Sequence, residues 1–207
     1  MLAIKSVKTA GDVYTIVLST GIERVFRLCY VPHQEYSPWV EGGVLTVDEE
    51  YACRFAAECF EVEQAALHLI ACAEQSAVNL SSKLIRQRYT RESVQAVITH
   101  LQDVDLLNDS RYARMWLESR MGAHINSPNQ LLATLCRRGL AHGVAHAAYK
   151  LVVTFEKELS LLTRYVSKKQ IACEGDPYET FRQLQAEGFS SAVLHAFFDA
   201  LPSARAS

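Results

Sequence analysis

The chain has 207 residues, of which 49% are hydrophobic and 21% are charged, and its formal net charge at pH 7 is −2. This composition supports a folded core and excludes an intrinsically disordered chain. No apolar run approaches the roughly 20 residues needed to span a bilayer, and the first residues lack a secretory pattern. We therefore expect a cytoplasmic protein.

Charge is unevenly distributed along the chain. Residues 76–170 hold 14 basic and 7 acidic side chains, whereas residues 1–75 hold 5 basic and 11 acidic ones. A basic middle between acidic ends suggests a polyanionic or acidic partner for the middle segment. Chance placement of surface charge is the alternative explanation.

Residues 1–47 predict a small β-rich region. Residues 3–9, 13–19 and 22–31 are alternating or rich in β-branched and aromatic side chains, and glycine-containing turns separate them. Three short strands bury little surface by themselves, so we expect them to pack on a helix.

From Asp48 onward the pattern is helical, and it repeats. Segments that begin at Ser76, Ser127 and Asp176 align without gaps, at spacings of 51 and 49 residues. Each segment predicts a helix, a tight turn and a second helix, and each follows a further helix. The fold expected is mainly α, with three tandem three-helix repeats (48–104, 105–153 and 154–207) that form an elongated curved arc.

The aligned positions predict the same local roles in each copy. Ser76, Ser127 and Asp176 are favourable N-caps, and proline follows the cap in the second and third copies. A leucine that we expect to be buried occupies one position throughout: Leu84, Leu135 and Leu184.

The turn between the paired helices also repeats. Gly139 and Gly188 stand where a left-handed conformation ends a helix, and Arg88 takes that place in the first copy. Thr90 and Ser190 can cap the helix that follows, whereas Ala141 in the second copy cannot.

Residues 106–120 predict an amphipathic helix with an aromatic inner face. Tyr112, Ala113, Trp116 and Leu117 are spaced to share one side, and arginines lie on another. The simplest interpretation is a structural helix that packs on the core with one face, exposes the other face to solvent and contacts no partner.

The sequence resembles the RecX family, bacterial regulators of the RecA recombinase. The segments LSSKLIRQRYTRESVQAVITHLQDVDLLNDSRYARMWLESR and LLATLCRRGL carry the resemblance. Asn108 departs from it where an acid is common, and Arg88 departs from it where glycine is usual. The matching residues are Leu84, Leu101, Leu106, Leu107, Asp109, Arg111, Tyr112, Ala113, Arg120, Leu135, Arg138 and Gly139.

The resemblance implies a curved helical modulator that lies in the groove of the RecA–DNA filament and spans neighbouring subunits. Such proteins restrain the ATPase, strand-exchange and co-protease activities of RecA. The resemblance therefore implies a role in DNA repair, recombination and the SOS response.

Paired basic residues near helix ends, together with the arginines of the predicted helix at 106–120, are the candidate contacts with RecA or with DNA phosphate. The planar guanidinium suits carboxylates and phosphates equally well, so the sequence leaves both targets open. Basic side chains at helix C-termini also complement the helix dipole without any partner. The candidates are Arg86, Arg88, Arg111, Arg114, Arg120, Arg137, Arg138, Lys168 and Lys169.

No metal, cofactor or catalytic site is expected. His142 and His146 share a helix face but lack further ligands. Phosphate-binding loops and nucleophile motifs are missing, so we expect a protein that is not an enzyme. Reduced, buried thiols are expected for the cysteines, which form no C-x-x-C pair: Cys29, Cys53, Cys59, Cys72, Cys136 and Cys173.

Three functions are compatible with these observations. The first is a monomeric, non-membrane inhibitor of the RecA filament. The alternative is a DNA-binding helical-repeat module without a recombinase partner, which predicts a steep salt dependence of binding to bare DNA. A structural scaffold that binds neither is the third.

Overall fold

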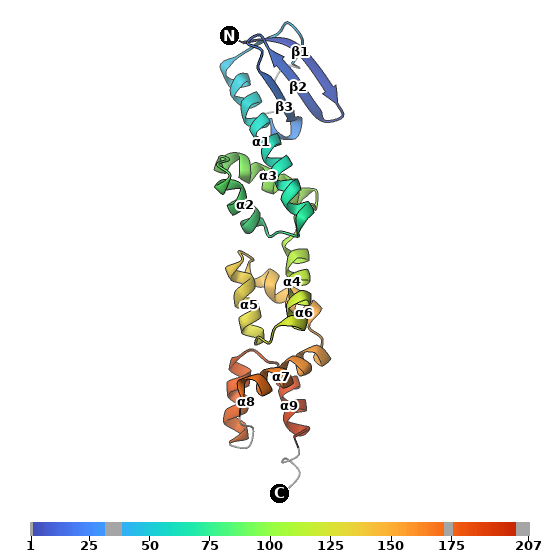
Figure 1. The fold of residues 1–207 in the computed structure, drawn as a ribbon, viewed down its shortest axis with the longest axis vertical. Helices are drawn as coiled ribbons and strands as arrows, with labels where there is room; N and C mark the ends of the chain where they lie inside the picture. The colour runs from blue at the N-terminus through green and yellow to red at the C-terminus, as the bar shows by residue number, and fades with distance from the viewer. Residues whose placement is uncertain (1, 32–38, 172–175, 202–207) are drawn as a thin grey trace. The chain divides into compact units, whose positions relative to one another are not determined.

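The computed structural model describes residues 2–31, 39–171 and 176–201, apart from the side chains of residues 122 and 123. The chain divides into two compact units, Met1–Asn108 and Asp109–Ser207 (Figure 1). It is mainly helical with a small N-terminal antiparallel sheet, which confirms the predicted fold class. Among the described residues, no helix combines the length and the apolar character needed to cross a bilayer.

The sheet of the first unit is antiparallel, with strand order β3-β2-β1-β4. The three predicted strands are β1 (Leu2–Ala10), β2 (Val13–Leu18) and β3 (Glu23–Arg27). A short strand that we did not expect, β4 (Val44–Leu45), pairs with the start of β1. Only two residues long, it offers too little alternation to be recognised from sequence.

The third strand ends earlier than predicted. The chain turns into a short 3₁₀ helix at Leu28–Tyr30, where a strand was expected to run to Val31. The turn buries Tyr30, and its ring meets the ring of His100 edge to face, with centroids 5.3 Å apart. Burial of this large side chain therefore competes successfully with continued strand pairing.

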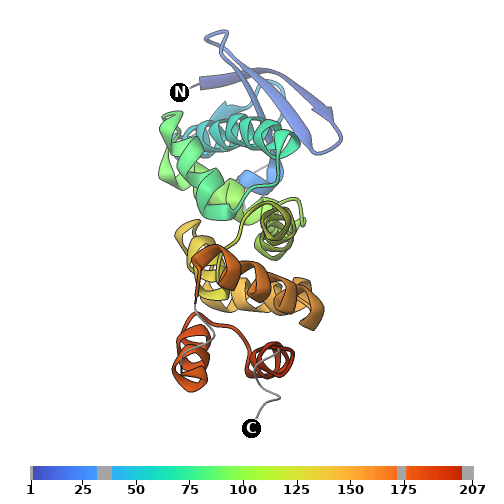
Figure 2. The same cartoon turned by 60° about the horizontal axis from the view of Figure 1, so that its bottom comes forward.

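Helix α1 (Val47–Cys72) packs against the sheet, as expected (Figure 2). A capping box fixes its start, because the Thr46 hydroxyl accepts from the Glu49 N–H and the Glu49 carboxylate accepts from the Thr46 N–H. Many of its buried residues are alanine or cysteine, which lets neighbouring elements approach closely. Ile16 and Phe26 from the sheet, both fully buried, belong to the same core.

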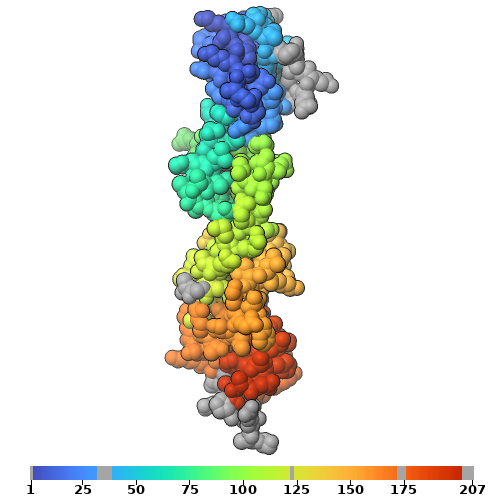
Figure 3. All heavy atoms as spheres, turned by 90° about the vertical axis from the view of Figure 1, so that its right-hand side faces the viewer, coloured from blue at the N-terminus to red at the C-terminus, as the bar shows by residue number. Residues whose placement is uncertain are grey.

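The described residues form eight further α-helices. In the first unit they are α2 (Ala77–Arg86) and α3 (Arg91–Asp103). In the second unit they are α4 (Asp109–Ala123), α5 (Pro128–Arg137), α6 (His142–Val152), α7 (Phe155–Lys169), α8 (Pro177–Ala186) and α9 (Ser191–Asp199). Figure 3 shows α7 and α9 on one face of the second unit.

The predicted caps and buried leucines are present. Ser76 and Ser127 each accept from the backbone N–H three residues on, and Asp176 accepts from the Tyr178 N–H. The aligned leucines are all 0% exposed: Leu84, Leu135 and Leu184. Three segments that are distant in sequence thus have the same local chemistry.

The turn residues adopt the expected left-handed conformation. Gly139 and Gly188 have φ of 91° and 96°, and Arg88 has φ of 72°. The first copy therefore keeps the backbone of the turn without its glycine. An L-residue in this region is strained, so Arg88 costs the first unit about 1 kcal/mol.

Ser190 occupies the N-cap position of α9, as expected, but its side chain does not make the capping hydrogen bond. Its hydroxyl donates instead to Glu158 of α7, with an Oγ–Oε2 distance of 3.0 Å, and its N–H donates to Oε1 at 2.7 Å. Thr90 does cap its helix, yet its N–H also donates to a carboxylate, Glu58 of α1, at 2.9 Å. Both acids precede their partner by 32 residues. In both cases a carboxylate from a helix two positions earlier in the chain therefore holds the start of a later helix: α1 holds α3, and α7 holds α9.

The cysteine prediction is only partly correct. The described cysteines are all free thiols, and Cys53 and Cys59 are buried. Burial raises the pKa of Cys53 to about 11 and of Cys59 to about 12. Cys29 and Cys72 are exposed, contrary to the expectation of burial. Cys173 lies outside the described residues.

Candidate partner-binding surface

The predicted basic residues are divided between the two units. Arg86 and Arg88 belong to the first unit, at the end of α2 and in the turn that follows it, and both are exposed. The remainder belong to the second unit: Arg111, Arg114, Arg120, Arg137, Arg138, Lys168 and Lys169. In that unit Arg111 and Arg120 are half-buried, and the other five are exposed.

Helix α4 presents the inner face that the sequence predicts. Tyr112, Ala113 and Leu117 are buried in the core of the second unit. Trp116 is only half-buried and packs at the edge of that core. Its indole Nε1 is covered but makes no hydrogen bond within the described part of the chain. The ring therefore contributes packing rather than a polar contact.

Two predicted contact residues converge on Trp116. The guanidinium carbon of Arg120 lies 5.6 Å from the ring centroid, and that of Arg138 lies 5.5 Å from it. Arg138 also donates from Nη1 to the Tyr112 hydroxyl, at 2.9 Å. Helix α4 and the C-cap of α5 thus bring together two arginines, a tryptophan and a tyrosine, which we call the Trp116 cluster: Tyr112, Trp116, Arg120 and Arg138.

Of the other candidates in this unit, Arg111 and Arg114 lie in the first half of α4, outside the Trp116 cluster, and the remaining three lie near the ends of α5 and α7. Arg137 donates from Nη2 to the Thr134 hydroxyl, at 3.0 Å. Lys169 lies over the Tyr165 ring, with its Nζ 5.9 Å from the centroid. Lys168 and Lys169 fall in the last turn of α7, where positive charge complements the helix dipole. Dipole complementation thus accounts for their position without a partner.

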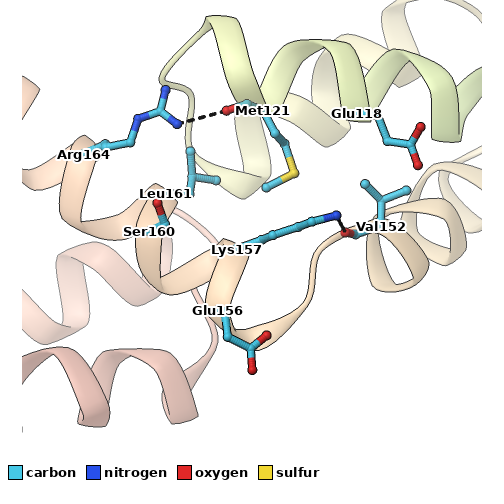
Figure 4. A pocket seen from close by; sticks show the side chains of 8 residues that line it. All are labelled: Glu118, Met121, Val152, Glu156, Lys157, Ser160, Leu161 and Arg164. Carbon is cyan, nitrogen blue, oxygen red and sulfur yellow. Dashed lines mark hydrogen bonds between the residues drawn. The ribbon is translucent and has the colours of Figure 1, made fainter.

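A pocket of about 410 Å³ lies between α4, α6 and α7, and sequence reasoning did not anticipate it (Figure 4). Lys157 Nζ donates to the Val152 carbonyl at 2.9 Å, and Arg164 Nη1 donates to the Met121 carbonyl at 3.0 Å. Both acceptors lie in the last turns of their helices, where carbonyls lack intrahelical partners. These two cations therefore satisfy backbone groups of the fold.

A second polar centre ties the sheet of the first unit to α1. Arg27 forms an ion pair with Asp12, and its Nε donates to the Glu63 carboxylate at 2.9 Å. The hydrogen bond with Asp12 raises the pKa of Arg27, although burial opposes that shift. Glu63 is only 3% exposed, so this pairing compensates a buried charge and serves stability.

The histidine pair gives no sign of a metal centre. His142 and His146 stack on α6, with ring centroids 6.0 Å apart. Within the described ranges, no group of three or more His, Cys, Asp or Glu side chains is arranged to hold a metal ion.

Comparison with known proteins assigns the chain to a family, although no family model matches it. The regulatory protein RecX of Treponema pallidum (strain Nichols) is 35% identical over 153 residues, which cover 73% of this chain and 93% of that protein. RecX of Finegoldia magna is 22% identical over 154 residues, or 74% of each chain.

Solved structures agree in fold. A crystal structure of regulatory protein RecX matches with a TM-score of 0.66 at 16% identity, over 96% of this chain and 100% of that one. RecX from Lactobacillus salivarius matches with a TM-score of 0.55 at 20% identity, over 70% and 96% of the two chains. With the sequence relationship above, the conclusion is that this chain belongs to the RecX family of regulatory proteins.

Proposed function

We propose that this protein binds the RecA–DNA filament in the bacterial cytoplasm and inhibits its ATPase, strand-exchange and co-protease activities, and so modulates DNA repair, recombination and the SOS response. The observation that carries the proposal is the 35% identity to a regulatory protein RecX across 93% of that protein's length. The relatives are named as regulatory proteins, which agrees with a protein that acts by binding rather than by catalysis.

The mechanism we propose is geometric. Capped helices and tight turns recur in the three-helix groups, and carboxylate contacts within the first and third groups would stiffen them further. A stiff monomer that bridges adjacent filament subunits would block the motions that ATP turnover requires. Basic residues of both units would supply the contacts to acidic protein surface or to DNA phosphate.

We also retain the three-fold repeat as part of the proposal, with copies at 48–104, 105–153 and 154–207 after a β-rich region at 1–47. The matching N-caps, buried leucines and left-handed turn residues support it. Repetition would present similar surfaces at regular intervals, as a filament of identical subunits does.

The proposal is tested by the DNA-dependent ATPase of RecA with this protein titrated in. We expect the rate to fall in a dose-dependent manner. An unchanged rate at micromolar concentrations of this protein would reject the proposal.

A DNA-binding module without a recombinase partner is the second candidate. The excess of basic residues between positions 76 and 170, 14 against 7 acidic ones, favours it. It predicts that the logarithm of affinity for bare DNA falls steeply with the logarithm of salt concentration. Weak affinity for bare DNA at low salt would exclude it.

A further inference from the structure

The Trp116 cluster holds an exposed cation in one position. Arg138 contacts the Tyr112 hydroxyl at 2.9 Å and the Trp116 ring at 5.5 Å, while its side chain stays exposed. Both supports belong to α4, and Tyr112 is buried in the core. A free arginine side chain loses considerable rotamer freedom on binding. Here folding has already restricted the Arg138 side chain, so a binding event would remove less of its rotamer freedom.

Positive charge gathers at the cluster. Arg120 lies over the same indole ring, and Arg137 is the chain neighbour of Arg138. Among the residues that the structure describes, no carboxylate forms an ion pair with Arg120 or Arg137. Like charges held close together repel one another, so an external anion would stabilise the arrangement.

We infer that the Trp116 cluster is a binding site for carboxylate side chains in an acidic segment of a partner protein. The planar guanidinium of Arg138 would bind one carboxylate in a two-pronged geometry, and Arg120 would add charge beside it. The inference rests on the proposed function, since it names the chemistry by which the second unit attaches to its protein partner.

Two considerations favour a protein partner over nucleic acid at this site. Trp116 is half-buried beneath two guanidinium groups, so little of its ring is left for a base to stack on. Tryptophan, tyrosine and arginine together are also the residues that dominate binding energy at protein interfaces.

The test uses the fluorescence of Trp116 in a Trp39→Phe variant, which leaves it as the only tryptophan. A decaglutamate peptide and a decathymidylate oligonucleotide are titrated separately into the full chain. We expect a saturable change in emission with the peptide. Arg138→Gln should weaken this binding about tenfold or more, and Arg182→Gln, which removes an exposed arginine elsewhere in the same unit, should not change it.

A response to the oligonucleotide alone, or to neither probe, overturns the inference. The melting temperature of each variant is measured in parallel. If Arg138→Gln does not fold, Arg138→Lys keeps the charge but loses the planar fork, and undiminished peptide binding by that variant overturns the inference as well.

Inhibition of the RecA ATPase separates this inference from the proposed function. If the unsubstituted protein inhibits and Arg138→Gln inhibits equally, the cluster is excluded as the attachment site while the proposed function stands. If the unsubstituted protein does not inhibit, the proposed function fails and the peptide titration alone decides what the cluster binds.

Discussion

Asn129 and Gly188 meet where α5 and α8 touch end to end within the second unit. The Asn129 N–H donates to the Glu187 carbonyl at 3.1 Å, and its Nδ2 donates to the Ala186 carbonyl at 2.7 Å. A Cβ at Gly188 would lie 2.5 Å from Asn129 Oδ1. The N-terminus of one helix therefore satisfies carbonyls at the C-terminus of the other, and the fit requires glycine.

Gly188→Ala should destabilise the second unit by about 2–4 kcal/mol, because it adds a clash to an unfavourable backbone conformation. Gly11→Ala is the matched control, since Gly11 has a positive φ but open space around it. It should cost only about 1 kcal/mol. Urea denaturation of both variants measures the difference, and equal losses would mean that the contact with Asn129 contributes nothing.

Arg88→Gly should stabilise the first unit. Arg88 holds a φ of 72°, where glycine has no steric penalty. We expect a gain of about 0.5–1 kcal/mol in the free energy of unfolding, because the relief of backbone strain is partly offset by the greater entropy of the unfolded chain. Chemical denaturation measures it, and a loss of stability would show that the Arg88 side chain contributes more than its backbone costs.

Replacing Trp116 separates packing from polar contacts. Trp116→Ala should cost about 3 kcal/mol, since it removes a ring that packs on the core of the second unit. Trp116→Phe should cost less than about 1.5 kcal/mol, because the lost Nε1 has no hydrogen-bond partner in the described chain. Thermal melting of both variants is the measurement. Similar losses for both would indicate that the indole nitrogen matters after all.

Glu58 should make the stability of the first unit depend on pH. Burial raises the pKa of this carboxyl, but hydrogen bonds from the Thr90 N–H at 2.9 Å and the Ser93 hydroxyl at 3.0 Å outweigh burial and hold the pKa below its usual value of 4.5. A group whose pKa is lower when folded stabilises the protein above its unfolded pKa. That stabilisation is lost as the pH falls from about 4.5 through the folded value.

The Glu58→Gln variant checks this pH dependence. Glutamine does not titrate, so the unfolding free energy of the variant should fall less steeply than that of the unsubstituted protein below pH 4.5. Urea denaturation at several pH values between about 3 and 7 gives the unfolding free energy of both proteins as a function of pH. This range covers the roughly one-unit spread of carboxyl pKa values in proteins. Parallel curves would rule out the contribution of Glu58.

Local features of the fold could be predicted from the sequence because they depend on neighbouring residues. Ser76 and Ser127 cap helices through contacts three residues away, and Gly188 takes a backbone conformation that other residues avoid. Features that depend on distant residues could not be predicted from the sequence. Ser190 reads as an N-cap, yet Glu158, 32 residues earlier, takes its hydroxyl.

The candidate surface shows the same division. The sequence identified Arg138 as a basic residue near a helix end and Arg120 as an arginine of an amphipathic helix, and both are local properties. It did not indicate that both would converge on Trp116, or that Arg138 would reach Tyr112, 26 residues away. The alternation of rings and arginines in α4 was the available signal, but its meaning depends on where α5 packs.

Binding to the RecA filament tests the central claim most directly. Co-sedimentation of this protein with RecA assembled on single-stranded DNA is compared with its binding to the same DNA without RecA, at physiological salt. We predict saturable binding to the filament and little binding to bare DNA. Equal binding in the two cases, or no binding to the filament at micromolar concentrations, would contradict the account.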